Sequence, residues 1–147
     1  MAKQFTPKPV KQSVISASAL SMVYQPDLIE DSRIENYSRK EFLSDLINEC
    51  EKDIRLCLGL LFSFYFQSIK SMSFLLFEGN GAHVVQLDFT EARLSLKVDP
   101  SGQTLKDFIS INNQVLDRFT REQQNKLGVH VCPGGDFDSC VSFKKFF

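Results

Sequence analysis

The sequence predicts an α/β protein, and the order of its segments is the main support for this prediction. Three short segments rich in apolar or β-branched residues alternate with two helical segments, in the order strand, helix, strand, helix, strand. This alternation is typical of a parallel sheet whose strands are joined by helical crossovers. The chain of 147 residues is long enough for one domain with a core, because ~150 residues bury roughly 70% of their unfolded surface.

The first strand and the first helix are expected in the amino-terminal half. Residues 10–19 are short, partly β-branched and preceded by a proline, which indicates a buried strand. Residues 38–58 are expected to form a helix, because Ser38 and Glu41 have the spacing of a capping box and apolar residues then recur at helical spacing.

The remaining elements follow in the second half of the chain. Residues 81–88 form a nearly continuous apolar segment that ends in an acid, which indicates a second strand. A helix with one apolar stripe is expected over residues 105–119, and Thr120 with Gln123 caps a further short turn. The third strand is expected in "VHVC", residues 129–132. Folds of this class usually place their chemistry at the carboxyl ends of such strands.

Charge and cysteine content restrict the partners and the compartment. The formal net charge is −1 and no long block of Lys or Arg occurs, so we expect binding neither to nucleic acid nor to a membrane. The four cysteines form no disulfide-like pattern and the first residues lack an apolar signal segment, which favours the cytoplasm. Cys50 and Cys57 share the apolar stripe of the first helix, so we interpret them as core residues.

His130 and Cys132 form a candidate metal site. Residues two apart in a strand point to the same face, so these side chains can offer a nitrogen and a sulfur to one ion. That donor pair favours zinc over magnesium or calcium. A catalytic zinc ion normally takes three protein ligands, so the pair alone does not make a site. The alternative is a partly buried histidine and cysteine in a strand.

Two segments carry a resemblance to a known family. "VVQLDFTEARLSLKVDPSG" and "LGVHVCPGGDFDS" resemble the carboxy-terminal catalytic domain of cobalamin-independent methionine synthase, and especially its less-characterised relatives. The resemblance covers residues 10–58 and 81–139. It implies a (β/α)₈ barrel of which about three strands are present, a zinc ion, and methyl transfer from methyltetrahydrofolate to the thiol of homocysteine. Residues 1–147 would then form one partial barrel domain.

The resemblance also implies roles for four residues. His130 and Cys132 match the first two zinc ligands of the family, and Asp88 matches an acid that holds the amino group of the substrate. Methionine synthases have Asp-Glu-Pro at this strand end, where this chain has Asp-Phe-Thr-Glu. Another thiol acceptor, for instance a coenzyme thiol, is therefore an alternative. Glu91 either contacts the substrate or pairs with Arg93.

The chain departs from the family in two places. Residues 59–80 are an insertion, and residues 140–147 replace the family's continuation. The family's third and fourth zinc ligands, a glutamate and a cysteine, lie on later strands that this sequence does not reach. We hypothesise that both segments are translated intron sequence. The alternative for residues 59–80 is a genuine hairpin or membrane-surface segment, since their interrupted apolar pattern is poor for a membrane span.

Two functional hypotheses follow. The first is a zinc-dependent thiol methyltransferase domain whose activity in this chain is uncertain because half of the zinc ligands are missing. The second is a non-catalytic fragment or interaction module that completes its sheet with a partner subunit. A partial parallel sheet leaves an exposed strand edge, so self-association through that edge is expected under the second hypothesis.

Overall fold

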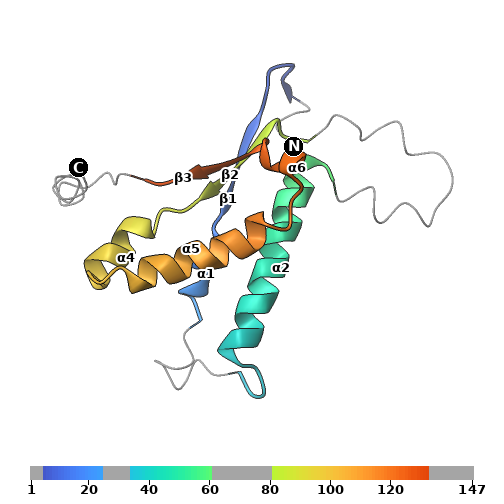
Figure 1. The fold of residues 1–147 in the computed structure, drawn as a ribbon. Coiled ribbons are helices and arrows are strands. Elements are labelled where there is room, and N and C mark those ends of the chain that lie inside the picture. Colours follow the sequence, from blue (N-terminus) through green and yellow to red (C-terminus); the bar gives the residue numbers. More distant parts are fainter. Residues whose placement is uncertain (1–4, 25–33, 61–80, 133–147) are drawn as a thin grey trace.

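A computed structural model describes residues 5–24, 34–60 and 81–132 (Figure 1). The α/β class predicted from the sequence is confirmed, with strands and helices alternating along the chain. The predicted tail at residues 140–147 and most of the predicted insertion, residues 61–80, lie outside the described residues. The elements are β1 (Lys11–Ile15), α1 (Ala17–Ser21), α2 (Arg39–Leu58), β2 (Val84–Asp88), α4 (Ala92–Val98), α5 (Gln103–Leu116), α6 (Arg121–Gln124) and β3 (Leu127–His130).

The three strands form one parallel sheet in the order β1-β2-β3 (Figure 1). Each strand therefore lies beside the next strand of the sequence. The register pairs Ile15 with Asp88, and Asp88 with His130. These residues are the last of their strands, so the three carboxyl ends meet at one edge of the sheet. We call this edge, together with the residues that directly follow the strands, the carboxyl edge.

Helices α2 and α5 cover one face of the sheet. Val85 and Leu87 of β2 are buried against them, at 1% and 2% exposure. The amphipathic pattern of the two helices accounts for this packing, because each buries one stripe. The core cluster of buried residues consists of Ala17, Ile47, Cys50, Ile54, Val85, Leu87, Ile111, Val115 and Phe119.

The core assignment of the first two cysteines is confirmed. Cys50 is buried at 4% exposure, and Cys57 packs against the core from its edge. Burial, with Asp53 and Glu49 nearby, raises the pKa of the Cys50 thiol to about 11. A thiol in this state is a poor nucleophile at neutral pH, because the thiolate is the reactive form.

The predicted strand at residues 10–19 is wrong in its second half. Ser16 leaves the strand, and its hydroxyl accepts a hydrogen bond from the backbone N–H of Ala19, so it caps α1. The strand is also more exposed than predicted. In β1 only Val14 is partly buried, because β1 is an edge strand of the described sheet and packs on the helices from one face.

Two further differences concern the second half of the chain. The third strand ends at His130, two residues earlier than predicted, so Cys132 follows the strand instead of lying in it. Helix α4 was not predicted, because it is short and Glu91 at its start makes no side-chain capping bond. The capping boxes at the starts of α2 and α6 are both present as predicted.

The residues that flank the predicted insertion lie next to each other. Helix α2 ends at Gly59, whose positive φ of 77° is typical of a helix terminus. The N–H of Ala82 donates to the carbonyl of Cys57 at 2.8 Å. A Cβ on Gly81 would lie 2.2 Å from the carbonyl oxygen of Leu58. The end of α2 and the segment leading into β2 are therefore in direct contact.

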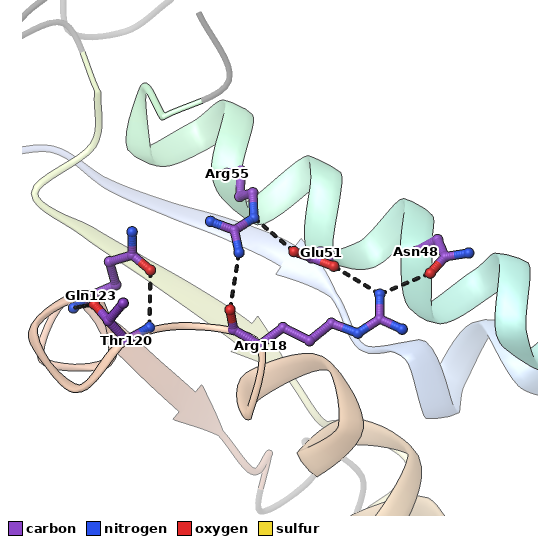
Figure 2. Close-up of polar contacts among 6 residues, drawn as sticks. All are labelled: Asn48, Glu51, Arg55, Arg118, Thr120 and Gln123. Atoms are coloured by element: carbon purple, nitrogen blue, oxygen red, sulfur yellow. Dashed lines mark hydrogen bonds and ion pairs between the residues drawn. The ribbon is translucent and has the colours of Figure 1, made fainter. Parts of the chain in front are cut away.

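A polar cluster joins α2 to the segment after α5 (Figure 2). Arg118 donates to Glu51 at 2.7 Å and to Asn48 at 2.8 Å, and Arg55 donates to Glu51 at 2.7 Å. The guanidinium of Arg55 also lies 4.6 Å from the ring centroid of Phe119. Burial raises the pKa of Glu51, but the hydrogen bonds from Arg118 and Arg55 outweigh it, so this pKa lies below its ordinary value. The cluster fixes the two helices against each other.

Candidate functional site at the carboxyl edge

Asp88 and His130 lie side by side at the carboxyl edge. They are register partners on β2 and β3, and the N–H of Phe89 donates to the carbonyl of His130 at 2.8 Å. Side chains alternate between the two faces of a strand, and partners on adjacent strands share a face. Because Leu87 is buried against the helices, Asp88 and His130 project from the opposite face. Two predicted site residues that are far apart in the sequence are thus neighbours.

A row of polar side chains holds Asp88 along this face. Gln86 donates from Nε2 to Oδ1 of Asp88 at 2.6 Å, and Oε1 of Gln86 accepts from the ammonium of Lys11 at 2.8 Å. Nε2 of Gln86 also lies 3.4 Å from the hydroxyl oxygen of Ser13. The amide of Gln86 is therefore oriented by Lys11, and it fixes one oxygen of Asp88.

Cys132 follows His130 by two residues and lies just beyond the strand. Both side chains are partly buried, and Cys132 carries a thiol. An imidazole and a thiolate are the donor types that zinc prefers, so the pair fits zinc in kind. Within residues 5–24, 34–60 and 81–132, no group of three His, Cys, Asp or Glu side chains is close enough to hold an ion. The pair alone falls short of the three or four ligands that a zinc site takes.

Glu91 belongs to a buried polar cluster behind the carboxyl edge. Glu91 is 4% exposed, and its Oε1 accepts hydrogen bonds from the hydroxyls of Ser16, at 2.7 Å, and of Ser18. The amide of Asn112 donates to the hydroxyl of Ser18 at 2.7 Å and accepts from its backbone N–H at 3.2 Å. We call these four residues the Glu91 network. Ser16 and Ser18 belong to the start of α1, Glu91 precedes α4, and Asn112 lies in α5.

One oxygen of this network has no partner. Oε2 of Glu91 is buried and makes no hydrogen bond within the described part of the chain. Buried polar atoms are nearly always paired, so an exception calls for a physical reason. The sequence predicted Glu91 as a substrate contact or a partner of Arg93, whereas the structure gives its carboxyl two serine hydroxyls as partners.

The other members of the Glu91 network were not identified from the sequence. Ser16 and Ser18 fell inside the predicted strand, and Asn112 was read as one position of an apolar helical stripe. A polar amide among apolar stripe residues was the available signal, because a buried amide needs hydrogen-bond partners. His83, by contrast, lies at the opposite end of β2 from the candidate site and is exposed.

The comparisons with known proteins give no relative for this chain. Neither a protein-family model, nor a curated protein, nor a solved structure matches it. Among the described residues, no helix combines the length and the apolar character needed to cross a membrane.

Proposed function

We propose that this chain forms the metal-binding and substrate-binding edge of a zinc-dependent thiol methyltransferase. The donor is a methyltetrahydrofolate and the acceptor is a thiol of the homocysteine type, as the resemblance to cobalamin-independent methionine synthases implies. The observation that carries the proposal is the register of Asp88 with His130, with Cys132 two residues further on. An acid, an imidazole and a thiol from two separate segments converge where α/β folds usually bind their substrates.

The sheet order supports the barrel part of the proposal. In a (β/α)₈ barrel each strand pairs in parallel with the next strand of the chain, and helices cover the outer face. The order β1-β2-β3 and the packing of α2 and α5 on one face agree with this arrangement. The opposite face carries Lys11, Gln86, Asp88 and His130, which would then line the interior of the barrel. The proposed (β/α)₈ fold thus explains why polar residues occupy that face.

Each residue has a distinct role in the proposed reaction. His130 and Cys132 would hold the zinc ion together with ligands from outside the described residues. A bound zinc ion supplies Lewis acidity that lowers the pKa of a coordinated thiol, so that a nucleophilic thiolate exists at neutral pH. Asp88 binds the ammonium group of the acceptor and thereby orients its sulfur. Gln86 keeps the Asp88 carboxylate in place through its 2.6 Å hydrogen bond.

Metal analysis of the purified full chain tests the zinc site. We expect bound zinc to be lost in His130→Ala and in Cys132→Ala. The matched controls are His83→Ala, at an exposed position near the amino end of β2, and Cys57→Ala, on helix α2. Both controls should retain the zinc content of the parent protein. Zinc that survives His130→Ala, or a parent chain that takes up no zinc when the ion is added, would contradict the proposal.

Activity is measured separately from metal content. Transfer of a labelled methyl group from methyltetrahydrofolate to homocysteine should occur in the parent chain or in its complex with a partner, and it should fall with Asp88→Asn. An Asp88→Asn variant that binds zinc normally and retains full transfer would remove Asp88 from the proposed site.

The second candidate function is an interaction module that completes its sheet with another subunit. Exposed apolar side chains on the sheet favour it: Ile15 is 59% exposed and Val84 is 37% exposed. Sheets made only of parallel strands are normally covered on both faces. Sedimentation of the purified chain distinguishes the two cases, since a monomer that folds cooperatively and binds zinc excludes a role that requires a partner.

A further inference from the structure

The free edge of β3 takes no part in the proposed methyl transfer. Within the described part of the chain, β3 lies at one end of the sheet and has a neighbour only on the side of β2 (Figure 1). The carbonyls of Lys126 and His130 accept hydrogen bonds from N–H groups on that side. Backbone groups of alternate residues point to opposite sides of a strand. The N–H and C=O of Leu127 and Val129 therefore point toward the free edge.

The side chains along this edge are apolar and incompletely covered. Val129 lies on the helix-covered face of the sheet, because it is the register partner of the buried Leu87. Leu127 packs against the core, whereas Val129 is 53% exposed and Val131, the first residue after the strand, is 51% exposed. Helices α2 and α5 thus leave the outer rim of this face open. Apolar side chains of this size gain free energy when another surface covers them.

The two edge strands of the described sheet differ in how they resist pairing. Natural edge strands are commonly protected by a proline, a charged side chain or a bulge. Strand β1 contains Lys11 and is preceded by Pro9. Between Leu127 and Val131 the sequence has no proline and no Lys, Arg, Asp or Glu. The edge of β3 is therefore the one whose sequence permits a further strand.

The residues around Val129 are complementary to a second copy of the same strand. Because both backbone groups of Val129 point outward, two antiparallel β3 strands centred on this residue exchange both of their N–H···O=C bonds there. Leu127 then lies opposite the partner's Val131, so the row on the helix-covered face consists of Leu and Val alone. On the other face His130 lies opposite the partner's Gly128, which has no side chain to obstruct it.

Opposite charges meet across the same arrangement. Lys126 precedes β3 and its carbonyl bonds to β2 as that of His130 does, so its side chain lies on the face that carries His130 and Asp88. In the antiparallel pair, Lys126 lies diagonally across from the partner's His130, whose register neighbour is the partner's Asp88. The long lysine side chain can reach that carboxylate, and the two-fold axis repeats the pair of charges.

We propose that two copies of this chain associate by antiparallel pairing of their β3 strands, centred on Val129, and form one continuous sheet. The inference identifies the partner in the second candidate function as another copy of the chain, and it depends on neither zinc nor methyl transfer. The interface is isologous, so it closes at the dimer and does not grow into a filament. An edge contact is small, and we expect a dissociation constant of about 1–100 µM.

Sedimentation equilibrium of the full chain, at concentrations on both sides of this range, should show a monomer–dimer equilibrium. Val129→Lys places two ammonium groups opposite each other at the centre of the pairing and should weaken the dimer by at least about 30-fold. Ile15→Lys is the matched control, because Ile15 is a 59% exposed apolar residue on the edge of β1. Its dissociation constant should equal that of the parent. A Val129→Lys variant that dimerises like the parent overturns the inference.

A charge exchange tests the direction and register of the pairing, with variants that leave the apolar rim unchanged. Lys126→Glu and Asp88→Lys should each weaken the dimer by about 3- to 10-fold, and the double variant should recover the parent affinity within about 2-fold. Within one copy these side chains lie at opposite ends of β2, since Asp88 ends the strand and the carbonyl of Lys126 bonds near its start. Recovery therefore reports a contact between copies, and its absence overturns the proposed register.

The oligomeric state and the zinc content together distinguish this inference from the proposed function. A chain that stays monomeric at every concentration overturns the inference, and it would mean that another segment or a different protein covers the edge of β3. Species that keep growing with concentration also overturn it, since they indicate head-to-tail pairing of β3 with β1. A zinc-binding monomer leaves the methyltransferase proposal standing without the dimer. A dimer that takes up no zinc supports the inference and refutes the methyltransferase.

Discussion

The junction between α2 and β2 predicts that residues 60–80 can be removed without loss of the fold. In the deletion variant Gly59 is joined directly to Gly81. The structure favours this closure, because Gly81 already touches Leu58 and the N–H of Ala82 bonds to the carbonyl of Cys57. A Cβ on Gly59 would lie only 3.3 Å from the nitrogen of Gly81. The two residues that the new peptide bond joins therefore already lie close together in space.

The expected gain in stability comes from the unfolded state. Closing a loop of n residues costs about (3/2)RT ln n, so shortening a connection from about 22 residues to about 2 recovers about 2 kcal/mol. With the usual unfolding entropy per residue, this free energy corresponds to an increase in melting temperature of about 8 °C for a chain of this size. The carboxyl edge lies at the other end of β2, so zinc binding should not change.

Differential scanning calorimetry and circular dichroism measure the effect. A variant in which residues 60–80 are replaced by a Gly/Ser segment of equal length is the control, and its melting temperature should equal that of the parent. Gly81→Ala is a second probe, because its Cβ would lie 2.2 Å from the carbonyl of Leu58, and it should lower stability by about 1–3 kcal/mol. The reasoning fails if the deletion lowers the melting temperature while the Gly/Ser control does not change it.

Three other predictions test the core, a loop and a thiol. Ile54→Ala should destabilise the protein by about 2–5 kcal/mol in denaturant titration, since Ile54 is 1% exposed; Leu56→Ala, at a 42% exposed position, should cost far less. Hydrogen bonds from Ser101 and from the backbone of Thr104 hold the pKa of Asp99 well below its usual range. A lowered pKa contributes stability that is present above the ordinary value near pH 4 and is lost as the pH falls through the folded-state value. Asp99→Asn should therefore lower the melting temperature at pH 7, and the difference should shrink below about pH 4. The raised pKa of Cys50, about 11, predicts that iodoacetamide at pH 8 modifies this thiol only on unfolding, and mass spectrometry of the folded protein showing rapid labelling would contradict its burial.

The parts of the fold that local signals determine were predicted well. The helix at residues 38–58 was predicted within one residue, because a capping box marks its start and an apolar stripe runs along it. The helix at residues 17–21 was missed, since Val14, Ile15 and the small residues after them resemble a continuous strand. The strand ends because the hydroxyl of Ser16 accepts a hydrogen bond from the N–H of Ala19 and so caps the helix that follows. Serine occurs both within strands and at helix N-caps, so its role depends on the conformation of the backbone around it.

The contacts of the candidate site also fall into those that the sequence could predict and those that it could not. Asp88 and His130 could be predicted as neighbours, because the carboxyl ends of parallel strands meet at one edge. The sequence could not predict that Ser16 and Ser18 contact Glu91. Nor could it predict the contact between Ser18 and Asn112. Ser18 and Asn112 are separated by 94 positions, and their contact depends on how α5 packs against α1. The sequence alone does not show that two residues so far apart in the chain are in contact in space.

The polar groups at the two ends of the helical layer differ in how completely they are paired. Near the end of α5, Arg118 and Arg55 both bond to Glu51, so each oxygen of this carboxylate has a charged partner (Figure 2). At the carboxyl edge, Glu91 accepts hydrogen bonds from the neutral hydroxyls of Ser16 and Ser18, and its Oε2 has no partner within the described part of the chain. A buried polar atom without a hydrogen-bond partner lowers the stability of a fold, and such atoms are rare. The α2–α5 contact is therefore satisfied by side chains of the described residues, whereas the carboxyl edge holds a buried acceptor that they leave unsatisfied.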